Sequence, residues 1–243
     1  MQNNTSLKIY LINLDRDSAR LAAEREQFES LGISFERVSA FETARIDAFR
    51  WWCAVLRPAS KGEAGCAASH CECYRRIVES GVGCAAVFED DVLLSRSAKS
   101  ALESVCGFCR ENPKALVLLG DHHESKTGRF SDDVRRPVKI IPESWDDCSE
   151  GYVIGKDAAA RLLKAQSPVR TPADWWSYFR NKGFLDLYRV DPPVCGQQTE
   201  RFASNVGERY VSEGKGVAER AWWRVRRAVG VAIDTVLDGR PGW

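Results

Sequence analysis

The stretch Cys84-Ala-Ala-Val-Phe-Glu-Asp-Asp-Val-Leu-Leu94 joins a short apolar run to three consecutive acidic residues. Cys84 to Phe88 is long enough for one buried strand, and Glu89, Asp90 and Asp91 follow at its carboxyl end. Three carboxylates this close repel one another, and burial would raise their pKa values. A divalent cation removes both problems, and hard oxygen ligands suit Mg²⁺ or Mn²⁺. The pattern therefore indicates either a metal site for a phosphorylated substrate or an acidic turn that caps the next helix.

Outward from this stretch, apolar runs alternate with amphipathic segments, which predicts one α/β domain. Ligands in such sheets bind just beyond the carboxyl ends of the strands, where the acidic residues would lie. Neither G-x-G-x-x-G nor G-x-x-x-x-G-K-[ST] occurs, which argues against a dinucleotide-binding protein or a P-loop NTPase. The segment 61–66 is expected to be a glycine-bearing turn, and 120–137 a loop over the site. Strands are expected at 8–14, 33–38, 84–88, 115–119, 138–141 (an edge strand), 151–155 and finally 185–190, and helices at 17–31, 67–80, 97–111, 157–165 and from 171 onward.

Composition narrows the class of protein. With 243 residues, 44% of them hydrophobic, the chain can bury an ordinary core, and its net charge of +1 gives no support for a nucleic-acid partner. The nine cysteines are an odd number and residues 1–6 are polar, which favours free thiols in a reducing cytoplasm. No apolar run approaches the ~18 residues of a membrane span.

The last part of the chain differs from the rest, which suggests a domain at 1–210 and a basic amphipathic tail at 211–243. On a helix over 217–237, Trp222, Val225 and Val229 fall on one side, with Arg224 and Arg227 opposite. Such a helix either lies on an anionic membrane surface or packs on its own domain or a second subunit. The expected location is cytoplasmic, or peripheral at the inner membrane.

Three motifs in order resemble glycosyltransferase family 25, the bacterial lipopolysaccharide glycosyltransferases. They are Ile9-Tyr-Leu-Ile-Asn-Leu-Asp-Arg16 with Arg20, Gly62-Glu-Ala-Gly-Cys-Ala-Ala-Ser-His70, and Val87-Phe-Glu-Asp-Asp-Val92. The segments 152–163 and 172–174 are similar to later parts of the family, whereas Ala64 stands where the family usually has a larger apolar residue.

The resemblance implies a GT-A-like nucleotide-sugar-binding domain, with a mixed central sheet flanked by helices. It also implies transfer of a hexose, most often galactose from UDP-galactose (or glucose from UDP-glucose), onto a saccharide or glycolipid acceptor such as lipopolysaccharide, with inversion. Competing readings are a metal-dependent phosphohydrolase or nucleotidyltransferase, and a non-catalytic carbohydrate-binding protein of the same fold.

The sequence and the family resemblance together indicate candidate residues for the functional site. Residues two apart in an extended segment point to one side, so Asp91 and then Glu89 are expected to bind Mn²⁺ or Mg²⁺, while Asp90 turns toward the sugar hydroxyls or serves as a structural cap. A general base is needed for inversion, and Asp174 or, as a weaker candidate, Glu150 could supply it. For Asp174 the alternative is a helix cap. The expected donor-site residues are Asn13, Leu14, Arg16, Glu63, Ser69, His70 and Gln197. Arg16 could equally be a solvated residue, and His70 rests on the motif alone.

Overall fold

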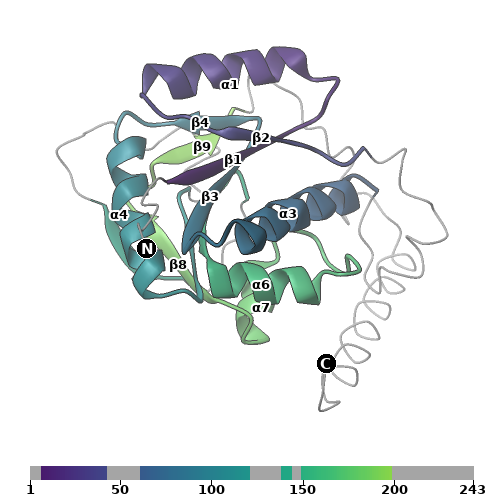
Figure 1. Ribbon diagram of the computed structural model, residues 1–243. Helices are drawn as coiled ribbons and strands as arrows, with labels where there is room; N and C mark the ends of the chain where they lie inside the picture. The colour runs from purple at the N-terminus through teal and green to yellow at the C-terminus, as the bar shows by residue number, and fades with distance from the viewer. Residues whose placement is uncertain (1–6, 43–60, 121–137, 144–148, 199–243) are drawn as a thin grey trace, which may run out of the picture.

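The computed structural model describes residues 7–42, 61–120, 138–143 and 149–198 (Figure 1). All but the first residue of the loop expected over 120–137 lies outside these residues, as do the domain boundary at residue 210 and the amphipathic tail. Among the described helices, none combines the length and the apolar character that a bilayer crossing requires.

The centre of the fold is a seven-stranded mixed sheet in the order β2-β1-β3-β7-β5-β8-β6. Its strands are β1 (Lys8–Asn13), β2 (Glu36–Ser39), β3 (Cys84–Glu89), β5 (Ala115–Leu118), β6 (Lys139–Pro142), β7 (Gly151–Gly155) and β8 (Asp186–Asp191). β1 pairs in parallel with both β2 and β3, so the carboxyl ends of these three strands meet at one edge. β7 runs antiparallel to β3 and β5, and β6 is the edge strand that the sequence predicts.

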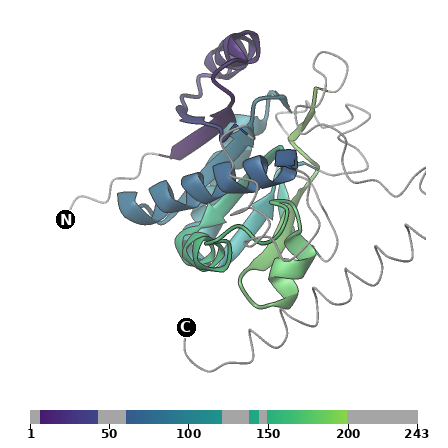
Figure 2. The same cartoon turned by 90° about the vertical axis from the view of Figure 1, so that its right-hand side faces the viewer.

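Helices cover both faces of the sheet. They are α1 (Ser18–Ser30), α3 (Lys61–Ser80), α4 (Ala98–Glu111), α6 (Lys156–Ala165) and α7 (Trp176–Asn181). One hydrophobic core lies under α1 and α4, and a second lies under α3, α6 and α7. Figures 1 and 2 show α1 and α3 on opposite sides of β1, and α3 beside α6.

The apolar run of β3 is explained by burial on both faces. Ala86 and Phe88 point into the core under α1 and α4, whereas Ala85 and Val87 point into the other core. Side chains alternate across a strand, so a strand between two helical layers needs apolar residues at every position. The prediction of a buried strand immediately before the acidic triplet is confirmed.

Two expectations for individual elements are wrong, and the helix expected from residue 171 begins only at Trp176. The glycine-bearing segment 61–66 is the first part of α3 rather than a turn before it, because Ala64 and Ala67 pack into the interior and stabilise the helix. The strand at 186–191 is also not the last, since β9 (Cys195–Gln197) pairs with β4 (Val92–Leu94) as a separate two-stranded sheet. Strands of three residues are too short to show a periodic pattern in the sequence.

We expect Gly155→Ala to destabilise the fold by about 1–3 kcal/mol. A Cβ at this position would lie 2.4 Å from the carbonyl oxygen of Pro113. That oxygen accepts backbone hydrogen bonds from Asp157 at 3.0 Å and Ala158 at 3.1 Å, so it is not free to move away. Denaturant unfolding of the purified variant measures the change.

Gly107→Ala is the matched control, because a Cβ at Gly107 in α4 meets no heavy atom within 4 Å. Alanine has the higher helix propensity, so this variant should gain about 0.5–1 kcal/mol. Equal changes in the free energy of unfolding for the two substitutions would contradict the close contact between Gly155 in β7 and the carbonyl oxygen of Pro113.

Candidate functional site

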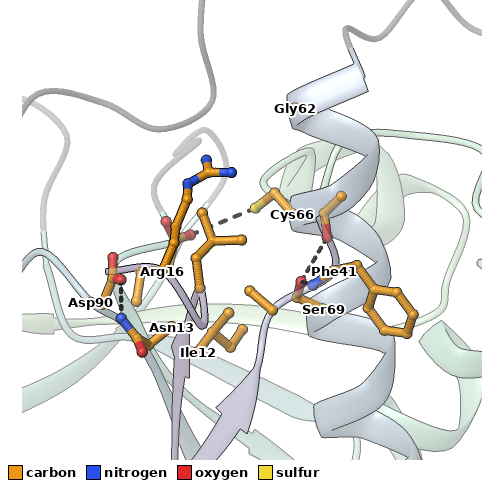
Figure 3. Close-up of a pocket in the computed structure, with 12 residues that line it drawn as sticks. Ile12, Asn13, Arg16, Phe41, Gly62, Cys66, Ser69 and Asp90 are labelled. Carbon is orange, nitrogen blue, oxygen red and sulfur yellow. Dashed lines mark hydrogen bonds between the residues drawn. The ribbon is translucent and has the colours of Figure 1, made fainter. Parts of the chain in front are cut away.

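A pocket lies at the carboxyl ends of β1 and β3, against the amino-terminal half of α3 (Figure 3). Asn13, Arg16 and Asp90 lie on the strand side, and Gly62, Cys66 and Ser69 lie on the α3 side. Residues from all three sequence motifs therefore meet in one place. Of the predicted site residues, the pocket is lined by Asn13, Leu14, Arg16, Ser69, Glu89 and Asp90.

Asp90 ties β1 and α1 to the end of β3. Its Oδ1 accepts a hydrogen bond from Arg20 Nη1 at 2.7 Å, and its Oδ2 accepts one from Asn13 Nδ2 at 2.7 Å. Burial raises the pKa of Asp90, and the bonds from Asn13 and Arg20 oppose this shift. Both carboxylate oxygens thus have protein donors, which favours the structural alternative for Asp90 that the sequence left open.

Glu89 points toward α3. Its Oε1 accepts a hydrogen bond from Ser149 Oγ and lies 3.3 Å from His70 Nε2 and 4.0 Å from Cys66 Sγ. One ligand atom from each of Cys66, His70 and Glu89 lies within 4.8 Å of the others, which is close enough to hold a metal ion. The structure therefore groups Glu89 with a thiol and an imidazole.

Asp91 is a buried carboxylate whose side chain is only partly satisfied. Asp91 is 5% exposed, and its Oδ2 accepts a hydrogen bond from Gln197 Nε2 at 3.0 Å. Its Oδ1 is buried and has no hydrogen-bond partner among the described residues. Burial, followed by the charge of Glu89, raises the pKa of Asp91 to about 6. An open buried oxygen beside a second acid fits a bound cation.

The other predicted residues are not among those that line this pocket. Gln197 is in β9 and reaches the site through Asp91. Glu150 is buried, and its backbone carbonyl accepts a hydrogen bond from Glu89 N at 3.1 Å. Glu63 is in the first turn of α3. Asp174 precedes α7, and its backbone carbonyl accepts a hydrogen bond from Trp176 N at 2.8 Å.

The α3 motif residues have structural contacts of their own. Ser69 donates to the carbonyl of Gly65 at 2.7 Å and accepts from the backbone of Phe41 at 2.9 Å. His70 is 1% exposed, and its Nδ1 lies 2.7 Å from the Tyr152 hydroxyl. Ser69 thus joins α3 to the chain after β2, and His70 joins α3 to β7.

The family model described as glycosyltransferase family 25 (LPS biosynthesis protein) matches residues 6–176. This span is more than half of the chain and includes all three motifs. The chain belongs to glycosyltransferase family 25. The family resemblance that the sequence predicts is confirmed.

Individual relatives agree with this family 25 membership. The chain is 25% identical to the lacto-N-neotetraose biosynthesis glycosyltransferase LgtE of Neisseria meningitidis serogroup B, over 57% of this chain and 54% of that protein. It is 29% identical to a putative glycosyltransferase of Haemophilus influenzae, over 88% of this chain and 79% of that protein. It is also 29% identical to procollagen galactosyltransferase 1 of Danio rerio, over 45% of this chain and 18% of that protein. The chain thus matches about half of the LgtE of Neisseria meningitidis and a smaller part of the procollagen enzyme.

The family 25 chain also has buried polar residues on α1 that sequence reasoning did not assign to the site. Glu24 is 0% exposed and accepts hydrogen bonds from Gln27 Nε2 at 2.9 Å and Gln198 Nε2 at 3.3 Å. Burial is the main cause that raises the pKa of Glu24 to about 8, with Asp91 and Asp90 adding to it and Gln27 opposing it. The sequence contains an indication of this polar face, because Arg20, Glu24 and Gln27 have the spacing of one side of a helix.

Proposed function

We propose that this chain is a glycosyltransferase that moves a hexose from a UDP-sugar, first of all galactose from UDP-galactose, onto a saccharide acceptor with inversion. The observation that carries this proposal is the pocket where three family motifs meet at the carboxyl ends of parallel strands. The names of two relatives support the choice of sugar and acceptor, because one is a procollagen galactosyltransferase and another takes part in lacto-N-neotetraose biosynthesis. A glycolipid such as lipopolysaccharide is the proposed acceptor.

The donor would lie across the end of β1. Arg16 lines the pocket and its side chain is 59% exposed, so its guanidinium is available for a bidentate contact with a diphosphate. Asn13 and Leu14 line the same wall and are proposed to contact the uridine end. Glu63, Ser69, His70 and Gln197 are the further donor-site residues of the proposal.

Glu89 and Asp91 are proposed to hold the Mn²⁺ or Mg²⁺. Asp91 has a buried Oδ1 that no described residue satisfies, and the charge of Glu89 contributes to its raised pKa. These features fit a cation between or beside the two carboxylates. When bound, such a cation offsets the negative charge that develops on the departing diphosphate. Asp90, held by Arg20 and Asn13, would fix the turn that presents both ligands.

Inversion requires a group that takes the proton from the acceptor hydroxyl. Asp174 is the first proposed base and Glu150 the second. Support for Asp174 is its position two residues before Trp176, whose ring centroid lies 5.1 Å from that of Tyr152. Tyr152 in turn contacts His70, which is on α3 next to the pocket-lining Ser69. Support for Glu150 is its burial beside the backbone of Glu89.

Mn²⁺ is expected to strengthen UDP binding by about tenfold or more, equivalent to ~1.4 kcal/mol. The reason is that the carboxylates of Glu89 and Asp91 repel a diphosphate unless a cation lies between the carboxylates and the diphosphate. Calorimetric titration of UDP, with Mn²⁺ or with a chelator, measures the difference. Equal affinity under both conditions would show that these acids do not hold a cation for the diphosphate.

The proposed function is tested by incubating the protein with UDP-galactose or UDP-glucose and Mn²⁺, with and without a saccharide acceptor. A transferase forms a glycoside and releases UDP in step with it. Cleavage of the donor at equal rate without acceptor would favour a phosphohydrolase, and binding without turnover would favour a non-catalytic protein. Either of these two results would contradict the proposal.

An anionic membrane surface is proposed as a further partner, on the sequence of residues 217–237 alone. The tryptophans and arginines of that segment are its only support. Peripheral location at the inner membrane stays a prediction with it.

A further inference from the structure

We propose that Cys66, His70 and Glu89 form a binding site for a borderline divalent cation of the zinc class, on the α3 wall of the pocket. This site differs from the proposed Glu89–Asp91 site in its ligand chemistry, and it does not depend on the proposed transfer reaction. It rests on three observations, which are the spacing of the ligand atoms, the contacts of the His70 ring and the access from the pocket.

The three ligand atoms are already close to the spacing of a tetrahedral site. From Zn–N and Zn–O bonds of ~2.0–2.1 Å and a Zn–S bond of ~2.3 Å, tetrahedral geometry places N and O roughly 3.3 Å apart and S and O roughly 3.6 Å apart. His70 Nε2 lies 3.3 Å from Glu89 Oε1, and Cys66 Sγ lies 4.0 Å from the same oxygen. All three atoms lie within 4.8 Å of one another. A rotation of the Cys66 side chain, which is at the pocket wall, would close the remaining gap.

The hydrogen-bond contacts of three rings favour a His70 tautomer whose lone pair faces Glu89. Tyr152 donates its hydroxyl proton to Tyr74 at 3.2 Å. The Tyr152 oxygen also lies 2.7 Å from His70 Nδ1, and its donation to Tyr74 favours the tautomer with the proton on Nδ1. In that tautomer His70 Nε2 faces Glu89 Oε1, which also accepts from Ser149, as an acceptor. A cation held by both atoms would use the two lone pairs that face each other.

The same chain of rings is the kind of outer shell that metal-binding histidines use. A partner on one ring nitrogen fixes the tautomer and aims the other nitrogen at the metal. His70 is fixed further by the ring of Tyr152, whose centroid lies 5.6 Å from its own. Zinc-binding histidines need this restraint, because a freely rotating ring loses the bond direction.

The ligand types select the cation. A thiolate and an imidazole prefer Zn²⁺ or Co²⁺ over Mg²⁺, which prefers oxygen ligands alone. On binding, the Cys66 thiol would release its proton to solvent and become the thiolate ligand. Cys66, which is labelled in Figure 3, and Glu89 both line the pocket, so a fourth coordination position would face it. Because Glu89 would belong to both sites, zinc at this site would compete with Mn²⁺ for that carboxylate.

The test is cobalt spectroscopy on the full chain after removal of metals with a chelator. We expect one equivalent of Co²⁺ to give a sulfur-to-cobalt charge-transfer band, and Zn²⁺ to displace it. Cys66→Ser keeps the size of the side chain and should abolish the band. Cys71→Ser is the matched control, because Cys71 is a buried thiol on the same helix whose Sγ contacts the carbonyl of Gln166 at 3.8 Å. This control should keep the band.

Calorimetry with Zn²⁺ provides the second measurement. Loss of an outer-shell partner costs ~10- to 100-fold in metal affinity, so Tyr152→Phe should weaken zinc binding by that factor while the charge-transfer band remains. Loss of the ligand itself in Cys66→Ser should weaken zinc binding more than Tyr152→Phe does. Circular dichroism confirms that each variant is folded.

Three outcomes would overturn the proposal. They are no zinc binding to the folded protein, a cobalt complex without the sulfur band, and a sulfur band that survives in Cys66→Ser. In the first case the contact between His70 and Glu89 is a hydrogen bond within the protein and not a pair of metal ligands. None of these outcomes depends on sugar transfer, so they are distinct from failure of the proposed function.

Discussion

Asp91→Asn and Asp91→Ala are expected to lower the rate of sugar transfer by about 100-fold or more, while the protein stays folded. Asp91 is the first proposed ligand of the cation that stabilises the departing diphosphate, and amide or methyl groups cannot replace a carboxylate in that role. Initial rates with UDP-galactose and Mn²⁺ measure the loss.

Folding stability should move in the opposite direction for Asp91→Asn. Burial and the neighbouring Glu89 charge raise the pKa of Asp91 to about 6, above the value of the unfolded chain. The folded state therefore holds the proton more tightly, and Asp91 costs stability as the pH rises through this range. Removing its charge should leave the free energy of unfolding at pH 8 unchanged or higher, measured with a chelator present. A carboxylate kept at a cost in stability is typical of a functional residue.

Asp186→Asn is the matched control for this prediction. Asp186 is at the start of β8, and its side chain is 54% exposed and pairs with Lys114 at 3.3 Å. Exposed pairs of this kind contribute little, so both rate and stability should stay near those of the wild type. Normal turnover in folded Asp91→Ala would eliminate the metal role of Asp91.

The strands were predictable where burial on two faces leaves a continuous apolar run. β1, β3, β5 and β7 are all of this kind, and the sequence places them within one residue of their observed ends. β4 and β9 were not predictable, because three residues carry no period and their pairing joins segments about a hundred residues apart. The start of α3 was missed because glycines at 62 and 65 suggest a turn, whereas tertiary packing keeps them helical.

In the candidate site too, some residues could be placed from the sequence and others only from the fold. The acidic triplet and the ends of β1 could be placed, because parallel strands bring their carboxyl ends to one edge. Cys66 and His70 are one helical turn apart, but only the fold brings Glu89 against them. Glu24 has the sequence appearance of an exposed helix residue, and its buried carboxylate accepts a hydrogen bond from Gln198, which is far along the chain.

Arg20→Met is expected to destabilise the fold by about 3–5 kcal/mol, which is the usual cost of breaking a buried ion pair. The guanidinium of Arg20 is buried, with Nη1 at 2.7 Å from Asp90 Oδ1 and 3.8 Å from Asp91 Oδ2. Removal of Arg20 would leave these two acids in a low-dielectric environment beside Glu24, without the positively charged guanidinium that opposes their repulsion. Denaturant unfolding at pH 8 with a chelator measures the loss.

Arg75→Met is the matched control, since Arg75 is exposed on α3 and pairs with Glu72 and Glu79. Its loss should change stability by no more than about 1 kcal/mol. In the double variant Arg20→Met with Asp90→Asn, much of the stability should return, because the stranded charge is removed together with its partner. If Arg20→Met is as mild as Arg75→Met, or if adding Asp90→Asn only makes matters worse, the Arg20–Asp90 pair does not hold α1 to the acidic turn.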